Sequence, residues 1–244
     1  MPEDIVALLE RAEAAAFEDM YAAAPPDLGA TARRVDGALV LETPALPVVS
    51  FNRAFAIDAM TDELLALPTT LQIAPDLPTD PLVARGLTEG VHWAKVIRGP
   101  VPPSPVNTGL EVRELEPGDG EAFGRVVAAA FEMPPLAVPW LAALIGRDGW
   151  RIYGSYDGER IVGAGALHVE GEVGWLGIGA TLASHRGRGG QGAVMARRIA
   201  DAIAAGCTTL TTETGMLPGR PNPSLSNMFR SGFTLAYERA NWSA

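Results

Sequence analysis

Cysteine and histidine are scarce in this chain, and their scarcity excludes two kinds of site. Of its 244 residues, one is a cysteine and three are histidines. The lone Cys207 has no partner for an intrachain disulfide, which favours a reducing compartment, and we interpret it as a small buried residue rather than an acyl-carrying nucleophile. His92, His168 and His185 are too scattered to predict a metal site or a catalytic triad, so we expect no metal.

Positive charge is also in short supply. The chain holds 29 acidic and 19 basic residues, a net charge of −10, and Lys95 is its one lysine. Because nucleic-acid binding needs a basic surface, we expect no nucleic-acid partner. The charge is uneven: residues up to Thr108 carry 15 acidic and 7 basic side chains, and those from Gly109 carry 14 and 12. The second part is therefore less repulsive to an anionic cofactor.

Long apolar runs are missing as well. No stretch is long and apolar enough to span a membrane, and the sequence from Met1 to Asp4 lacks the basic start of a signal peptide. We therefore expect a cytoplasmic protein without a membrane partner, and the use of arginine in place of lysine indicates a GC-rich bacterial genome. Apolar residues still make up 48% of the chain, enough for a core.

A proline-rich segment divides the chain. Residues 99–109 predict a linker between a first domain, 1–98, and a second domain, 110–244. The first domain is expected to contain a helix over 4–24, a hairpin around Asp36-Gly37, a strand over 48–57 and short elements up to a strand over 91–97.

The second domain shows a regular order of elements. The periodicities predict a strand over 110–115, helices over 120–132 and 136–145, strands over 151–156, 160–169 and 172–182, a helix from Gln191, a strand over 208–213, a helix capped by Ser224 and a closing strand pair. This order predicts an α+β fold with an α/β mixed sheet.

A glycine-rich loop, residues 184–192, joins the last of the three central strands to the following helix. Glycines allow positive φ and close approach of the backbone to a ligand. The first turn of the helix has N–H groups without intrahelical partners, and Arg186 and Arg188 precede it. We expect the unpaired N–H groups from Gly187 to Ala193 to bind a phosphate or pyrophosphate.

The order of strand, glycine-rich loop and helix is also found in two kinds of nucleotide-binding loop. A P-loop is excluded because no lysine follows the glycines. Residues 187–192 match Gly-x-Gly-x-x-Gly, and Glu213 lies near the expected acidic position of a dinucleotide-binding unit. The chain that remains after Glu213 is too short for the other strands of a doubly wound sheet, which disfavours a nucleotide-dependent oxidoreductase.

Residues 181–189 resemble the acyl-CoA loop of the GNAT superfamily of N-acetyltransferases, which carries Arg/Gln-x-x-Gly-x-Gly/Ala. Arg186 and Gly189 occupy the first and fourth places, and Gln191 departs from the pattern at the sixth. Residues 224–233 resemble the last helix of that family, with its asparagine at Asn227 and a Gly-Phe end. The resemblance covers roughly residues 110–242.

The resemblance implies a GNAT-like acyl-CoA N-acyltransferase fold that binds acetyl-CoA. Thr181 or Leu182 is implied as the N–H donor to the thioester carbonyl. The implied cofactor-binding residues are Ala180, Thr181, Leu182, Arg186, Gly187, Arg188, Gly189, Gly190, Gln191, Gly192, Ala193 and Asn227.

The catalytic residues are less clearly marked. Glu213, at the end of its strand, is the candidate base, acting directly or through water, and Glu172 is a more distant alternative. For either one, the competing interpretation is a solvated surface carboxylate. Met228 occupies the place where family members often have a tyrosine acid, and Tyr237 is the nearest substitute.

The first domain has two interpretations. Residues 84–95 faintly echo 230–239, which indicates a degenerate GNAT-like copy in tandem with the second domain; an unrelated α+β unit is the alternative.

The sequence as a whole predicts an acetyl-CoA-dependent N-acetyltransferase. The acceptor stays open among small amines, amino acids, aminoglycoside-like drugs and protein N-termini. The alternative is a binding module, a sensor or interaction protein that binds acyl-CoA without turnover. The sequence does not indicate the oligomeric state.

Overall fold

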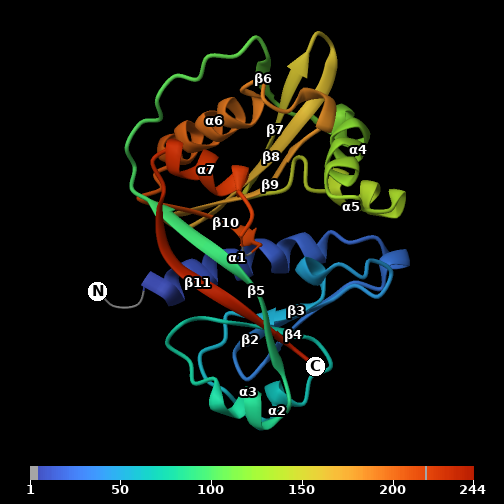
Figure 1. The fold of residues 1–244 in the computed structure, drawn as a ribbon. Coiled ribbons are helices and arrows are strands. Elements are labelled where there is room, and N and C mark those ends of the chain that lie inside the picture. The colour runs from blue at the N-terminus through green and yellow to red at the C-terminus, as the bar shows by residue number, and fades with distance from the viewer. Residues whose placement is uncertain (1–4, 218) are drawn as a thin grey trace.

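The computed structural model describes residues 5–217 and 219–244, and its strands form one sheet that runs through the molecule (Figure 1). The strand order is β1-β2-β3-β4-β11-β5-β10-β9-β8-β7-β6. The strands are β1 (Thr31–Val35), β2 (Ala38–Glu42), β3 (Arg53–Phe55), β4 (Thr70–Ile73), β5 (Thr88–Arg98), β6 (Glu111–Glu114), β7 (Trp150–Asp157), β8 (Arg160–Glu170), β9 (Val173–Thr181), β10 (Thr209–Met216) and β11 (Thr234–Ser243).

Seven α-helices flank the sheet within these residues. They are α1 (Ile5–Ala22), α2 (Asp62–Leu65), α3 (Asp80–Ala84), α4 (Gly120–Ala130), α5 (Val138–Ala142), α6 (Gly190–Ala204) and α7 (Pro223–Arg230). None of the helices in the described ranges is long and apolar enough to cross a membrane. The mixed sheet with flanking helices agrees with the α+β class predicted from the sequence.

Local sequence signals explain the hairpin between β1 and β2. Asp36 and Gly37 both have positive φ, 46° and 89°. This is the conformation that a two-residue type I′ turn requires, and Asp-Gly is among the sequences that adopt it readily. The predicted hairpin is therefore confirmed at these residues.

Two strand predictions were wrong. The strand expected over 48–57 is confined to β3, since Val49–Phe51 form a 3₁₀ turn before it. The closing strand pair is also absent: in the described residues after α7 only β11 follows. The strand that pairs with β11 in place of the expected one is β5.

Strand β5 lies between β10 and β11 and is antiparallel to both. Lys95 of β5 is paired in register with Glu213 of β10 on one side and with Tyr237 of β11 on the other. On its far side β11 pairs with β4, for example Asn241 with Gln72. The sheet is thus continuous between the two predicted domains, whose boundaries stay a prediction.

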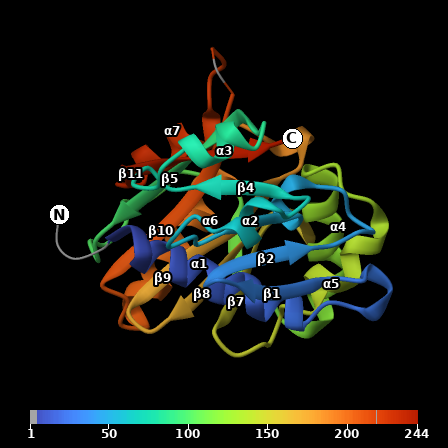
Figure 2. The same ribbon diagram turned by 90° about the horizontal axis from the view of Figure 1, so that it is seen from below.

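Helix α1 runs across the middle of the molecule, between β8 and β9 on one side and β2 and β3 on the other (Figures 1 and 2). The ring of Phe17 packs edge-on against Phe55 at 5.7 Å and against Trp175 at 5.6 Å. Trp140 Nε1 donates to the Met20 carbonyl at 2.7 Å. The helix therefore joins the two parts of the sheet through a shared core.

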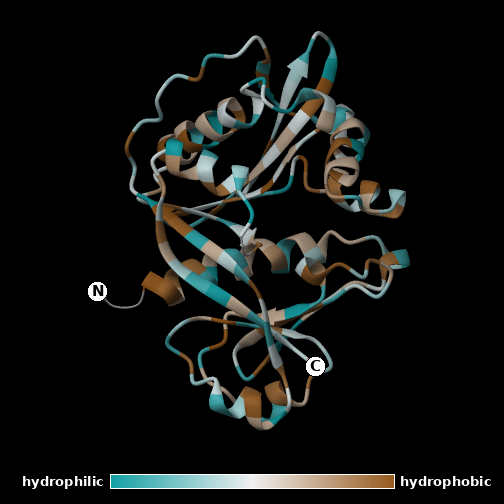
Figure 3. Ribbon diagram, in the orientation of Figure 1, coloured by the Kyte–Doolittle hydropathy of each residue, from teal (hydrophilic) through white to brown (hydrophobic). Residues whose placement is uncertain are grey.

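The end of the molecule that carries α2 and α3 has a separate apolar cluster. Helices α2 and α3 carry hydrophobic segments there (Figure 3). Leu64 of α2 and Leu82 of α3 are fully buried and pack in one cluster with Trp242 of β11. The last strand of the chain thus completes the core of the first part.

Candidate cofactor cleft and reaction cavity

The site is organised around a break in strand pairing. Strand β9 pairs in parallel with β10 only from Val173 to Trp175, and the two strands separate beyond that point. On its other side β9 has a bulge against β8, since the pairing shifts between Ala164–Ala180 and Ala166–Gly177. Backbone groups of β9 beyond Trp175 consequently have no ladder partner on β10, which leaves donors for a ligand.

The residues at the bulge explain how the backbone can adopt it. Ile178 has φ +53°, a conformation that costs a branched residue about 1–2 kcal/mol. At Gly177 a Cβ would lie 1.9 Å from Cη2 of Trp175, so only glycine allows that ring to fold back over the strand. The glycines around Ile178 therefore permit the bulge.

The glycine-rich loop also adopts the conformation expected of it. Gly187 and Gly189 have φ of +78° and +82°, and Gly189 caps the start of α6. In the described part of the chain no hydrogen bond involves the N–H groups from Gly187 to Gly192. The predicted run of unpaired N–H groups is one residue too long, because Ala193 N donates to Gly189 O at 3.0 Å.

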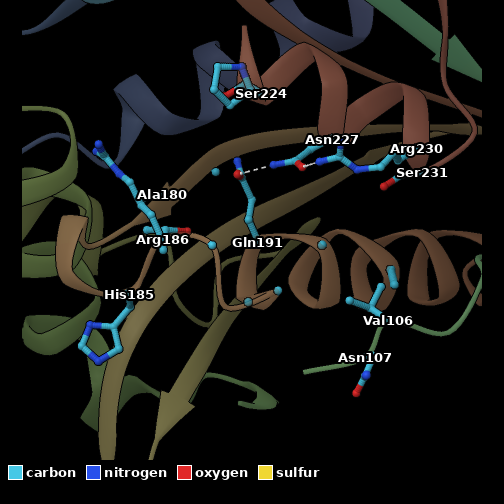
Figure 4. A pocket seen from close by; sticks show the side chains of 18 of the residues that line it. Val106, Asn107, Ala180, His185, Arg186, Gln191, Ser224, Asn227, Arg230 and Ser231 are labelled. Carbon is cyan, nitrogen blue, oxygen red and sulfur yellow. Dashed lines mark hydrogen bonds between the residues drawn. The ribbon is translucent and has the colours of Figure 1, made fainter. Parts of the chain in front are cut away.

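These groups open onto a cleft of about 930 Å³ (Figure 4). In the figure Gln191 extends from the start of α6 toward Asn227 of α7, whose Nδ2 donates to Gln191 Oε1 at 2.8 Å. Ser224, predicted as a helix cap, lines the cleft instead. The cap is Asn222, which accepts from Leu225 N at 3.0 Å.

Most of the residues predicted to bind cofactor line this cleft. The exceptions are Leu182, Arg188 and Ala193. Leu182 N donates to Val162 O at 2.9 Å, so of the two predicted carbonyl donors this one is already bonded. The Arg188 guanidinium pairs with Asp157 at 2.7 Å. The members that do line the cleft are Ala180, Thr181, Arg186, Gly187, Gly189, Gly190, Gln191, Gly192 and Asn227.

The predicted linker forms part of the cleft, which the sequence did not indicate. Pro103 to Asn107 line it opposite α7. Asn107 O lies so close to the loop that a Cβ on Gly189 would approach it to 2.9 Å, and Thr108 Oγ1 donates to Arg188 O at 2.7 Å. The linker therefore restricts both the loop and the space in front of it.

A second cavity of about 330 Å³ continues from the cleft past the bulge. Phe131, Gly179, Gln191 and Ser224 line both spaces. Its wall is largely aromatic and aliphatic and includes side chains of the first part of the chain. The ring-bearing members are Phe17, Phe51, Trp93, Phe131 and Trp175.

Glu213 lines this second cavity and is not a solvated surface carboxylate. Its side chain is 9% exposed, and its Oε2 accepts from Lys95 Nζ at 3.0 Å and from Arg239 Nη2 at 2.5 Å. Burial, together with the nearby Glu13 carboxylate, raises the pKa of Glu213, although the surrounding cations act in the opposite direction. Glu172 lines neither space.

Glu213 belongs to what we call the buried ion cluster. Its members are Glu10, Glu13, Arg53, Lys95, Glu213 and Arg239. Glu13 of α1 accepts from Arg53 Nη2 at 2.7 Å and also from Lys95. Burial alone would raise the pKa of Glu13, but Arg239, Lys95 and Arg53 lower it well below its usual range.

Tyr237, the predicted acid, lines neither the cleft nor the second cavity. Its hydroxyl donates to Glu10 Oε1 at 2.5 Å within the buried ion cluster. Met228, which stands where the family often has a tyrosine, does line the second cavity. Tyr237 was predicted as the acid because it is the tyrosine nearest along the chain to the expected position. That signal does not predict that its hydroxyl lies among the ions of the buried ion cluster.

Comparison with known proteins gives matches among solved structures only. A scan against protein-family models finds no match, and neither does a search of curated proteins. The chain is similar to a GCN5-related N-acetyltransferase from Kribbella flavida at 14% identity and TM-score 0.66, covering 96% of this chain and 94% of the other.

Two further structures match part of the chain. A GCN5-related N-acetyltransferase from Sphaerobacter thermophilus matches at 19% identity and TM-score 0.58 over 71% of this chain, which spans 58% of that protein's length. A tandem GNAT protein from the clavulanic acid biosynthesis pathway matches at 15% identity and TM-score 0.53, covering 72% of this chain and 63% of its own. At these identities the likeness confirms the predicted GNAT-like fold.

Proposed function

We propose that the protein is an acyl-CoA-dependent N-acetyltransferase that passes an acetyl group from acetyl-CoA to an amine. The observation that carries the proposal is the continuity between a donor-lined cleft and a cavity holding a buried carboxylate. Among the described residues, the N–H groups at the start of α6 and the Arg186 side chain have no hydrogen-bond partner, and both suit a pyrophosphate. The splayed end of β9 suits a pantetheine arm, because its backbone groups have no strand partner there.

In this proposal each part of the site has one task. Acetyl-CoA supplies the thioester, and the amine attacks its carbonyl carbon as the carbon–sulfur bond breaks and the thiolate leaves. N–H groups of the β9 bulge, at Ile178 or Gly179, are the donors we assign to the carbonyl oxygen in place of Leu182, whose N–H is bonded to Val162 O, and Thr181 stays a predicted donor. Asn227, held to Gln191, borders the path of the pantetheine arm.

The amine must lose a proton, and we assign its removal to Glu213. The short bonds from Lys95 and Arg239 both go to Oε2, whereas Oε1 has only the longer ion pair with Arg53 Nη2 at 3.9 Å among the described residues. We therefore assign the ligand's proton to Oε1, directly or through water. A raised pKa suits a base that works near neutral pH. The aromatic wall from the first part of the chain would bound the acceptor.

A specific observation favours a second candidate, a binding module without turnover. Among the described residues that line the cleft and the second cavity there is no tyrosine, and Met228 stands in the acid's place. Without an acid the thiolate must leave unprotonated, which slows release but does not prevent it. Both candidates bind acetyl-CoA, but only the enzyme transfers the acetyl group and releases the thiol.

Thermal unfolding tests the binding that both candidates need. We expect millimolar acetyl-CoA to raise the melting temperature, since a ligand at 100 times its Kd stabilises by about 2.7 kcal/mol. The double variant Arg186→Ala, Gly189→Val should lose most of that rise, because it removes the Arg186 cation and fills the loop next to Asn107 O. An unchanged melting temperature of the natural protein contradicts the proposal.

A control variant and a turnover assay complete the test. Gly187→Ala has the same positive-φ strain, but no atom of the described residues lies within 4 Å of the added Cβ, so it separates backbone strain from obstruction. Release of free thiol from acetyl-CoA with a panel of amines then distinguishes the enzyme from the binding module, which binds and releases none.

A further inference from the structure

Arg198 of α6 is a buried cation that the proposed chemistry has not used. Its residue is 1% exposed, and within the described chain no carboxylate pairs with it. Burial lowers its pKa to about 10, so the guanidinium is still charged at neutral pH. An unpaired buried charge costs several kcal/mol, which a purely structural residue of similar volume would avoid.

The contacts of Arg198 lie at the bulge of β9. Nη1 donates to Ala166 O of β8 at 3.0 Å and to Gly177 O of β9 at 2.9 Å. Nη2 lies 3.7 Å from Met195 Sδ, a weak acceptor. Ala166 and Gly177 are the register pair at which the shift toward Ala164–Ala180 begins. One guanidinium nitrogen thus binds a carbonyl on each strand where regular pairing stops.

The sequence leaves room for this arrangement. A Cβ at Gly165, the β8 residue within the register shift, would lie 2.8 Å from Arg198 Cζ, so the guanidinium rests against a residue with no side chain. A Cβ at Gly179 would lie 3.8 Å from Nη2. Arg198 and Gly179 also line the second cavity. The cation is therefore beneath the bulge and next to the space where the thioester would lie.

We propose that Arg198 is a positioning residue that holds the β9 bulge open. By binding the carbonyl oxygens of Ala166 and Gly177, it keeps the N–H groups of Ile178 and Gly179 directed at the thioester carbonyl oxygen. Its charge also makes that end of the cavity electropositive, where the carbonyl oxygen gains negative charge during attack. This inference rests on the proposed function.

The test reads the polarisation of the bound thioester and needs no knowledge of the acceptor. Acetyl-CoA labelled with ¹³C at the thioester carbonyl is bound to the full-length protein, and isotope-edited infrared spectra give its carbonyl frequency. We expect a shift to lower frequency on binding to the natural protein. Arg198→Met should lose most of the shift while the melting-temperature rise with acetyl-CoA persists, and Arg198→Lys should keep part of it.

Two further variants guard against misfolding and indirect effects. Gly165→Ala displaces the guanidinium without removing it and should also lose the shift. Arg197→Met removes the neighbouring arginine, whose Nε lies 2.8 Å from Asp201 Oδ2 and which does not contact the bulge in the described part of the chain. This variant should keep the shift in carbonyl frequency. With an accepted amine, thiol release by Arg198→Met should fall on the order of 10²-fold, the loss typical of removing one donor to the carbonyl oxygen, because the bulge N–H groups that Arg198 positions would no longer be directed at it.

The outcomes separate this inference from the function on which it rests. No melting-temperature rise in the natural protein would contradict the proposed function itself. Binding with an unshifted carbonyl band would overturn the role of the bulge. A full shift in folded Arg198→Met and Gly165→Ala, or an equal loss in Arg197→Met, would overturn the role of Arg198.

Discussion

At the scale of single residues, the buried ion cluster is the least expected feature of the structure. The nitrogen and oxygen atoms of Arg239, Glu13 and Glu213 lie within ion-pair distance, and all three side chains are less than 10% exposed. Desolvating such groups is costly, so each ion depends on its partners for compensation. The cluster also fixes Glu213 at the wall of the second cavity.

Removing one cation from the cluster should therefore destabilise the whole fold. We expect Arg239→Met to lower the free energy of unfolding by about 3–5 kcal/mol, because Glu10, Glu13 and Glu213 lose a shared partner. Urea denaturation measures the change. The control is Arg34→Met: Arg34 pairs with Glu18 at 2.7 Å on the surface, where a pair contributes about 0–1 kcal/mol. Equal effects of the two variants would contradict the prediction.

The sequence predicted the position of Glu213 near the reaction but not its surroundings. Its cationic partners stand at residues 53, 95 and 239, and no local pattern relates positions so far apart. The same holds for Arg198, since the sequence does not show which of the adjacent Arg197 and Arg198 faces solvent until the fold shows Arg198 buried. Long-range charge pairing is decided by topology and not by spacing along the chain.

At the scale of elements, the parts with local causes were predictable. The hairpin at Asp36-Gly37 and the loop at 184–192 follow from backbone conformations that glycine and aspartate favour. The bulge of β9 was not predicted from the residues, because it depends on how Trp175 folds over Gly177 and on Arg198 from another element. Local signals predicted the presence of the strand, and packing determined its shape.

The contact between β5 and β11 should depend on pH through His92. Burial by itself would lower the pKa of His92, but hydrogen bonds to Glu238 of β11 and to Glu89 raise it above its usual 6.5. A raised pKa means that the stabilising contact is complete below pH 6.5 and is lost as pH rises through the higher folded value.

We therefore expect stability to fall modestly from pH 6 to pH 8, and His92→Gln to reduce that dependence. Both partners are partly exposed, so the effect is screened by solvent and salt. Urea denaturation at the two pH values measures it, and NMR titration of the ring gives the folded pKa. A measured pKa below 6.5 would show that the contact with Glu238 does not form in solution.

At the scale of the whole molecule, the strand order is what the sequence could not indicate. The order of elements predicted a mixed α+β sheet, and the resemblance of residues 181–189 and 224–233 to GNAT motifs implied the GNAT-like fold; the degenerate copy in the first part stays a prediction. The placement of β5 between β10 and β11 joins residues more than a hundred positions apart, as the pairing of Lys95 with Glu213 shows. A prediction that pairs strands adjacent in the sequence expects β11 to pair with a strand that follows it, and not with β5.

This order predicts that the two sides of the linker stay together after it is cut. A protease site inserted between Pro102 and Pro103, which lie in a segment without helix or strand, would leave β5 on the first fragment and β10 and β11 on the second. We expect the cleaved protein to elute as one species in size-exclusion chromatography and to separate only in denaturant. Two fragments eluting apart without denaturant would show that the shared strands do not hold the halves together.

The placement of β11 also constrains how the chain can reach its native state during synthesis. Translation delivers β4 and β5 long before the segment Thr234–Ser243 that fills the gap between them. Until that segment leaves the ribosome, both strands present unsatisfied edges, which are sites for aggregation. A nascent chain released early is therefore incomplete in both halves at once, and neither half can serve as a finished scaffold for the other.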